Sequence, residues 1–115
     1  MVQRFEIGPR MSQVTVHNGT VYLAGQVADD ATQDVAGQTR QVLAAIDALL
    51  ERAGTHKGQI LMAQIFLPDM ADFAAMNSAW DAWVIPGHTP PRATVQAKLA
   101  GTEWKVEIVV TAALV

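Results

Sequence analysis

The sequence predicts an α+β two-layer sandwich, in which one mostly antiparallel, mixed sheet is covered on one face by two helices. Three observations support this class. Short runs with an apolar residue at every second position are typical of strands, and two longer segments repeat apolar residues at the steps of three and four that mark amphipathic helices. These segments follow one another as strand-strand-helix-strand-helix-strand-strand. The chain, 1–115, is long enough for a single domain with one core.

The N-terminal part is predicted to form antiparallel strands. Alternation over Val2–Ile7 permits a short first strand. Asn18-Gly19 is a strong two-residue hairpin turn, and it joins Gln13–His17 to Thr20–Gly25. Gly25 is interpreted as a glycine that relieves a bend at the end of its strand.

Two helices are predicted in the middle of the chain. The first begins near Thr32 and ends at Gly54, because glycine suits the left-handed position that follows a helix. Its apolar face consists of Val35, Thr39, Val42, Leu43, Ile46, Leu49, Leu50 and Ala53. The second helix follows the capping residue Asp69 and runs to about Val84. Its apolar face consists of Phe73, Met76, Trp80, Trp83 and Val84.

The strand between the helices, 60–67, has Gln64 as its one polar residue, which predicts that both of its faces are covered. The last strand also carries apolar residues on both faces. Two helices cover only one face of a sheet, so a monomer would expose the other face to water. We therefore expect an oligomer that packs sheet faces or edges together.

The last quarter of the chain is predicted to be a hairpin. Period-2 runs at 90–99 and 104–110 are joined by the short loop 100–103. In this register Arg92 and Glu107 lie on the same, more polar face, about 13 Å apart at the usual strand rise. If the two residues act together, we expect them to do so across a subunit interface.

Arg92, Glu107 and Asn77 are candidate site residues, and each has a plainer alternative. The fork of Arg92 suits bidentate capture of a small carboxylate, although a solvated or structural arginine is favoured on the sequence alone. Glu107 is a lone carboxylate in an apolar strand, which favours a general acid or base, and its alternative is a pair with Lys98 or Lys105. Asn77 either reaches a pocket or caps a buried backbone group.

Composition narrows the function. The net charge is −3 and the cations are scattered, so no nucleic-acid partner is predicted. There is no cysteine, hence no disulfide framework or thiolate nucleophile. His17, His56 and His88 share no metal-ligand spacing, and no metal site is predicted. We find neither a signal peptide nor an apolar run of membrane-spanning length, so no membrane partner and a cytoplasmic location are expected.

Several short motifs resemble, in order and spacing, those of the RidA family, also called the YjgF family. The motifs are Ala24-Gly25-Gln26, Ala53-Gly54, Asp72-Phe73 with Met76-Asn77, Pro91-Arg92-Ala93 with Val95, and Val106-Glu107-Ile108. The resemblance extends over about residues 10–113, and the run Trp80-Asp81-Ala82-Trp83-Val84 is most similar to the YoaB branch. It implies a chorismate-mutase-like fold assembled as a homotrimer, with pockets between subunits.

The resemblance also implies an activity. Members of the RidA group hydrolyse reactive 2-enamino and 2-imino acids, of the 2-aminoacrylate type, to 2-oxo acids and ammonia without a cofactor or metal. Arg92 matches the family arginine that binds the substrate carboxylate, and Glu107 matches the glutamate that positions the attacking water. Asn77 and the Ala24-Gly25 backbone match positions that line or support the pocket.

Three matched positions depart from the family pattern. The pocket tyrosine falls at Met11, the serine at Ala24 and a frequent cysteine at Thr94, so substrate or rate is expected to differ. Two other functions stay open. A non-catalytic trimer that binds small carboxylates in a regulatory role is favoured by the first two departures. An endoribonuclease, an activity attributed to some family members, is disfavoured by the acidic balance of charge.

Overall fold

The structure is a computed structural model that describes all 115 residues. It contains one six-stranded sheet, two α-helices and two single-turn 3₁₀ helices. In chain order the elements are β1 (Gln3–Ile7), β2 (Ser12–His17), β3 (Thr20–Leu23), α1 (Val35–Ala53), η1 (Lys57–Gln59), β4 (Ile60–Leu67), η2 (Met70–Asp72), α2 (Phe73–Trp83), β5 (Arg92–Gln96) and β6 (Glu107–Ala113).

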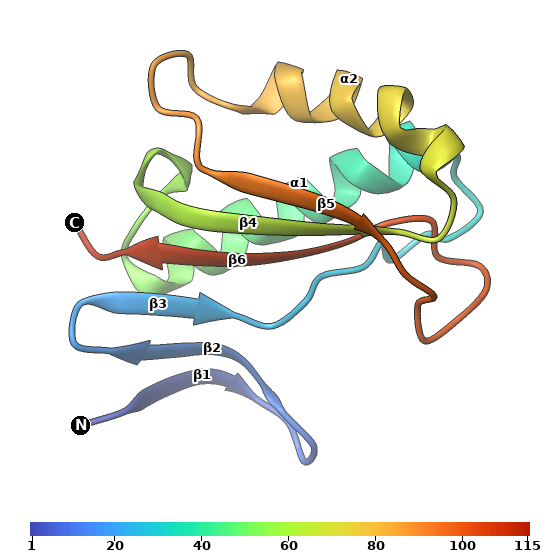
Figure 1. The fold of residues 1–115 in the computed structure, drawn as a ribbon. Helices are drawn as coiled ribbons and strands as arrows, with labels where there is room; N and C mark the ends of the chain where they lie inside the picture. Colours follow the sequence, from blue (N-terminus) through green and yellow to red (C-terminus); the bar gives the residue numbers. More distant parts are fainter.

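The strands lie in the order β1-β2-β3-β6-β4-β5. Neighbouring strands are antiparallel except β4 and β5, which run parallel. In Figure 1, α1 runs behind the sheet, α2 lies next to α1 towards the β5 edge, and the face turned to the viewer carries no helix. The predicted α+β sandwich, with a mixed sheet and two helices on one face, is thereby confirmed.

The hydrophobic core fills the space between the sheet and the helices. Alternate strand residues point into it, and they include Val14, Val16, Val21, Leu23, Ala63, Ile65, Leu67, Ile108, Val110 and Ala112. From α1 the core receives Val35, Val42, Leu43, Ile46 and Leu50. Removing these side chains from water is the main stabilising contribution, at about 25 cal/mol per Å² of apolar surface.

Local signals place the ends of several elements as predicted. Asn18 and Gly19 have φ angles of 51° and 76°, and this turn joins β2 to β3. The first helix ends at Gly54, whose φ of 89° lies in the left-handed region. Its start at Val35 is later than the predicted start near Thr32, because Asp34 supplies the cap by accepting a hydrogen bond from the Gly37 N–H at 2.8 Å.

The prediction that the last two strands form a hairpin is wrong. β4 lies between β5 and β6, so the two strands do not pair. The strand predicted at 90–99 covers only Arg92–Gln96, and the strand predicted at 104–110 runs over Glu107–Ala113 instead. β5 follows β4 through the α2 crossover, and such a crossover returns a strand parallel to the one before it.

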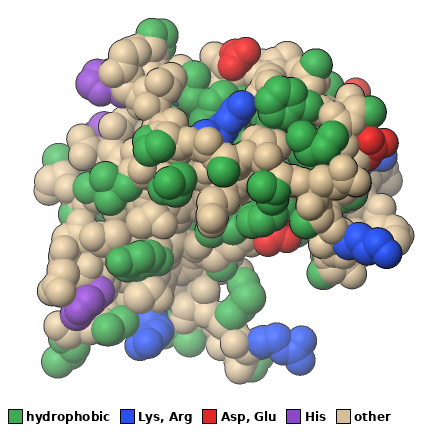
Figure 2. All heavy atoms as spheres, in the orientation of Figure 1, with side chains coloured by type: hydrophobic (Ala, Val, Ile, Leu, Met, Phe, Trp, Pro, Cys, Tyr) green, Lys and Arg blue, Asp and Glu red, His purple; other side chains and the backbone are tan.

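The second face of β4 is not covered within one chain. Ala63, Ile65 and Leu67 are buried towards the helices, whereas Met62 is 44% exposed and Gln64 is also exposed. The exposed large hydrophobic side chains of the chain include Tyr22, Leu61, Met62 and Val95. Figure 2 shows hydrophobic side chains spread over this helix-free side of the molecule. The predicted two-sided cover of 60–67 would therefore need a second chain.

Gln38 of α1 fixes the segment that enters β6. Its side chain is fully buried, and its Nε2 atom lies 3.2 Å from the carbonyl oxygen of Glu103. The Lys105 N–H donates to its Oε1 atom at 2.9 Å. The backbone on both sides of Trp104 is thereby attached to α1, just before Glu107 begins the strand.

We expect Gln38→Leu to lower the free energy of unfolding by about 1–3 kcal/mol, because the Glu103 carbonyl and the Lys105 N–H would lose their partner. Chemical denaturation of the variant measures this loss. Gln41→Leu, at a half-buried position of the same helix, is the matched control and should have a smaller effect. Equal stability of wild type and Gln38→Leu would contradict the assigned role.

Candidate active site

Arg92 is held by one face of α2. Its Nη1 atom donates a hydrogen bond to Asn77 Oδ1 at 2.8 Å. Its Cζ atom lies 5.2 Å from the ring centre of Trp80 and 5.9 Å from that of Phe73. Phe73, Asn77 and Trp80 are spaced by four and three residues, so they lie on the same side of the helix. One hydrogen bond and two cation–π contacts therefore fix the guanidinium.

The charge of Arg92 is not neutralised within the chain. The one salt bridge of the structure joins Arg52 to Glu6, at 3.3 Å. Asn77 accepts from one nitrogen of the Arg92 guanidinium, which has five N–H donors in all. Between the two readings of Asn77, the structure therefore supports a role towards Arg92 rather than a backbone cap. The remaining donors suit a small carboxylate.

Thr94 places a second polar group beside Arg92. It lies two positions further along β5, on the same face of the strand. Its Oγ1 atom is buried and has no hydrogen-bond partner. Nine in ten or more buried polar groups do have a partner, so this hydroxyl is unusual. It leaves a donor and an acceptor open next to the guanidinium.

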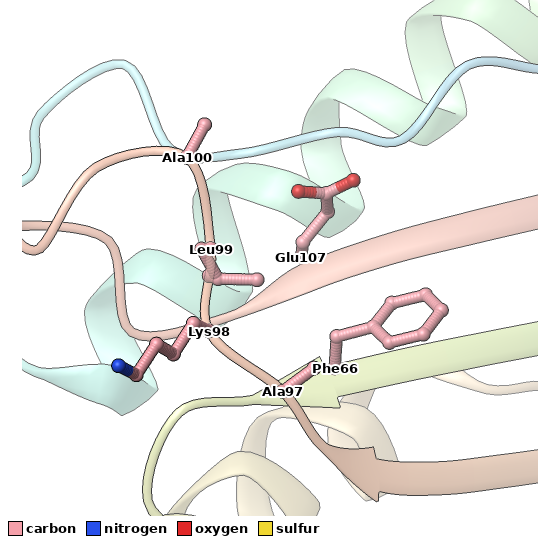
Figure 3. Close-up of a pocket in the computed structure, with 6 residues that line it drawn as sticks. All are labelled: Phe66, Ala97, Lys98, Leu99, Ala100 and Glu107. Carbon is pink, nitrogen blue, oxygen red and sulfur yellow. The ribbon is translucent and has the colours of Figure 1, made fainter.

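Glu107 is the first residue of β6 and lies on the uncovered face of the sheet. It pairs with Phe66 across β4, and the next residue, Ile108, points into the core. A cavity of about 280 Å³ adjoins it and is lined by Phe66, Ala97, Lys98, Leu99, Ala100 and Glu107. Figure 3 shows the Leu99 side chain turned towards Glu107 and the Lys98 side chain extending away from it. The predicted alternative, an ion pair with Lys98 or Lys105, is not formed.

Gly25 allows Glu107 to occupy its position. A Cβ atom at Gly25 would overlap the Glu107 carboxylate and would lie 3.0 Å from its Cδ atom. The neighbouring residue Gln26 bonds to Ile108 in both directions, at 2.9 and 3.1 Å, which holds the two segments together. The close approach, rather than a bend alone, therefore requires glycine here.

The structure separates Arg92 from Glu107. The prediction that they share a face is wrong, since Arg92 turns towards α2 and Glu107 lies on the helix-free face. Arg92 pairs with Ala63 and Glu107 with Phe66, so they are three positions apart along β4, about 10 Å at the usual rise. β5 and β6 also flank β4, a further separation of about 10 Å. One chain thus keeps these two candidate groups apart, and we call their surroundings the Arg92 half-site and the Glu107 half-site.

Of the other predicted residues, Gly25 approaches Glu107, and Ala24 is its neighbour in sequence. Ala24 follows β3, and its N–H donates to the Gln13 carbonyl at 2.9 Å. Met11 precedes β2 and is 48% exposed. Sequence reasoning missed the amide pair beside them, in which Gln26 Nε2 donates to Gln13 Oε1 at 2.8 Å. The sequence feature that could have indicated this pair is the position of Gln26 directly after Gly25.

Outside these two regions, the structure shows one carboxyl group with a shifted pKa and no cluster of metal ligands. Hydrogen bonds from Thr32 and then Gln33 hold the pKa of the exposed Asp30 carboxyl below its ordinary value, in the loop before α1. No three His, Asp or Glu side chains lie close enough to share a metal ion. Neither α-helix has the length and apolar character needed to span a membrane.

The six-stranded sheet with two helices and the separated Arg92 and Glu107 half-sites can now be compared with known proteins. The family model described as endoribonuclease L-PSP matches residues 2–114. The chain therefore belongs to this family, which is also called YjgF or RidA. The predicted family is thereby confirmed.

Its relatives include the RutC family protein YoaB of Escherichia coli K12, which is 50% identical over 113 residues, 98% of each chain. Among solved structures, NMB1025 of Neisseria meningitidis, described as a member of the YjgF protein family, is 44% identical with a TM-score of 0.98. That match covers 100% of this chain and 96% of the other. The likeness to YoaB confirms the predicted branch.

Proposed function

We propose that this protein hydrolyses reactive 2-enamino and 2-imino acids to 2-oxo acids and ammonia. The observation that carries the proposal is the guanidinium of Arg92, which α2 holds in place and no carboxylate of the chain neutralises. Such a group binds the carboxylate of a small substrate and fixes its orientation. The resemblance of the Arg92 and Glu107 motifs to those of the RidA group implies the same reaction class.

In the proposed reaction, Glu107 orients or deprotonates the water that attacks the imine carbon. A new C–O bond forms while the C=N bond opens, and the resulting carbinolamine then loses its nitrogen as ammonia. The products are one 2-oxo acid and one ammonia for each imine and water consumed. An enamine enters the same route after it takes up a proton on carbon.

We further propose that Arg92 of one copy and Glu107 of another complete each pocket, in a homotrimer. Two observations support an assembly of copies. The two half-sites lie apart within one chain, and apolar side chains such as Met62 and Val95, 44% and 46% exposed, lie on the uncovered side. Residues Asn77, Thr94, Ala24, Gly25 and Met11 would line or support the pocket. The number three comes from the resemblance to the family.

A second candidate is a trimer that binds small carboxylates without turning them over and acts as a regulator. Met11 and Ala24 favour it, because neither side chain can donate a hydrogen bond where the family has a phenol and a hydroxyl. The printed family description names an endoribonuclease. The net charge of −3 does not favour a phosphate-binding track, and we do not propose that activity.

The testing experiment couples the protein to a threonine dehydratase that releases the imine from threonine, with semicarbazide competing for that imine. We expect the protein to accelerate the release of 2-oxobutanoate and to lower semicarbazone yield. Absence of acceleration with several amino-acid-derived imines, together with binding of 2-oxo acids measured by calorimetry, would instead support the regulatory candidate.

The Gly25–Glu107 contact gives a separate prediction. In Gly25→Ala the new methyl group would displace the Glu107 carboxylate, and we expect kcat to fall by about a hundredfold, as for other small misplacements of a catalytic group. Gly101→Ala is the matched control, because its Cβ would also meet a carboxylate, that of exposed Glu103, outside the site. Equal kcat values for both variants would refute a positional requirement at Gly25.

A further inference from the structure

The cavity beside Glu107 has an apolar lining. Four of its six lining residues are hydrophobic, namely Phe66, Ala97, Leu99 and Ala100. Figure 3 shows the Glu107 side chain between the Leu99 side chain and the Phe66 ring, while the Lys98 amine points away from the carboxylate. The volume of about 280 Å³ is near the lower end of pockets that hold small molecules.

The lining is held in place by the surrounding backbone. Phe66 faces Glu107 across the ladder between β4 and β6. The Ala97 N–H donates to the Leu67 carbonyl at 3.1 Å, which ties the start of the connection to β4. Gln38 ties its end to α1 through Lys105. Both ends of the segment that carries Leu99 and Ala100 are therefore attached to elements of the core.

The residues near Glu107 offer a substrate few free side-chain hydrogen-bonding groups, because the Gln26 amide already donates to Gln13 Oε1 and to the Ala24 carbonyl. Gly25, which approaches the Glu107 carboxylate, and its neighbour Ala24 have no polar side-chain atom. A polar group that enters such a lining loses its hydration without gaining a partner, which is unfavourable. The imine carbon of a 2-imino acid carries three substituents. In the proposed reaction, Arg92 binds the substrate carboxylate, and the nitrogen leaves as ammonia. The third substituent, the amino-acid side chain, therefore suits the apolar cavity.

We propose that the site prefers 2-imino acids with aliphatic side chains of three or four carbons or their thioether equivalent, over 2-aminoacrylate and 2-iminopropanoate. Phe66 and Leu99 determine this preference by contacting the side chain. The proposal rests on the proposed function, and it deepens that function by naming the substrate class. The imines must come from reactions that oxidise apolar amino acids at the Cα–N bond, because these amino acids carry no leaving group on Cβ to eliminate.

The experiment compares imines generated by an L-amino acid oxidase, with catalase present and semicarbazide competing. Alanine, 2-aminobutyrate, norvaline, leucine and methionine supply the apolar series, glutamine supplies a polar side chain, and each rate is normalised to the amount of amino acid oxidised. We expect kcat/KM to rise about fourfold with each methylene from alanine to norvaline, the factor that burial of one methylene gives. The glutamine imine should fall below the norvaline imine.

Two variants assign the effect to the lining. Leu99→Thr places a hydroxyl in the cavity, so the rise with chain length should flatten. Lys105→Ala removes an exposed side chain of the same connection that does not line the cavity, and the rise should persist. Hydrolysis with a flat or falling series in the wild type would overturn this inference while leaving the proposed function standing.

A second readout separates the two proposals if no imine is hydrolysed. Calorimetry would then compare binding of pyruvate, 2-oxobutanoate, 2-oxopentanoate and 4-methyl-2-oxopentanoate. Affinity that rises along this series would support the apolar cavity although the deaminase proposal had failed. Equal affinities, or absence of binding by every member, would overturn the inference.

Discussion

Arg92→Ala is expected to lower kcat/KM for imine hydrolysis by about a hundredfold or more, and to weaken 2-oxo acid binding by a similar factor. Removing one partner of a buried, hydrogen-bonded charge pair typically costs about 2–5 kcal/mol, which corresponds to this range. The loss should be large because the Arg92 guanidinium is already oriented by Asn77 and Trp80. A substrate carboxylate thus binds to a group that needs little reorganisation.

Two further variants make the Arg92 result specific. Arg92→Lys keeps the charge but loses the planar fork, so it should recover only a small part of the binding. Arg40→Ala removes an exposed arginine of α1 that forms no salt bridge, and it should leave binding unchanged. Thermal unfolding followed by circular dichroism would establish that each variant is folded. Full 2-oxo acid affinity in folded Arg92→Ala would exclude the anchor role.

Glu107→Gln should lower kcat by about 10²–10⁴-fold, the usual contribution of a general acid or base, while 2-oxo acid binding is largely retained. Glutamine has nearly the same shape, so the contact with Gly25 would persist and the lost function is that of the carboxylate. Single-turnover kinetics with a pre-formed imine would separate the chemical step from binding. A parallel loss of binding and turnover would instead indicate that the carboxylate holds the substrate.

Mixed assemblies test whether a site is shared between copies. Arg92→Ala keeps Glu107, and Glu107→Gln keeps Arg92, so a pocket contains both groups when the Glu107→Gln copy supplies the arginine and the Arg92→Ala copy supplies the glutamate. After co-refolding in equal amounts, a ring with head-to-tail interfaces should recover roughly a quarter of the wild-type activity. A site contained within one chain would give no recovery. Size-exclusion chromatography with light scattering would report the number of copies.

The sequence predicted the layers of this fold but not the pairing of its last strands. Periodicity found both helices and the hairpin around Asn18-Gly19, because those signals are local. The runs near Arg92 and Glu107 also alternate, and alternation says nothing about which strand is the neighbour. The missed signal was the order strand-helix-strand from β4 to β5, which favours a parallel pair and leaves β6 to join on the other side of β4.

The geometry expected for the candidate residues was wrong, whereas their roles stay predictions. Residue chemistry and pattern singled out Arg92, Glu107 and Asn77, and the resemblance to a family matched them and Gly25, but the faces on which they lie depended on the register. Because β5 pairs in parallel with β4 rather than in a hairpin with β6, Arg92 lies on the helix side of the sheet, where it bonds to Asn77. The requirement for glycine at position 25 could not be predicted from its neighbours in sequence, because it arises from the side chain of Glu107, which lies on a strand distant in sequence.

The position of each half-site in the sheet has a dynamic consequence. β6 has hydrogen-bonded strands on both sides, whereas β5 is an edge strand with one neighbour. Backbone amides of a central strand open and exchange with solvent more rarely than those of an edge strand, since more contacts must break. Within a chain, we therefore expect the backbone amides around Glu107 to exchange slowly. Those around Arg92 should exchange more often. In the proposed reaction, the Arg92 side would therefore adjust to substrates of different size, while Glu107 keeps its position.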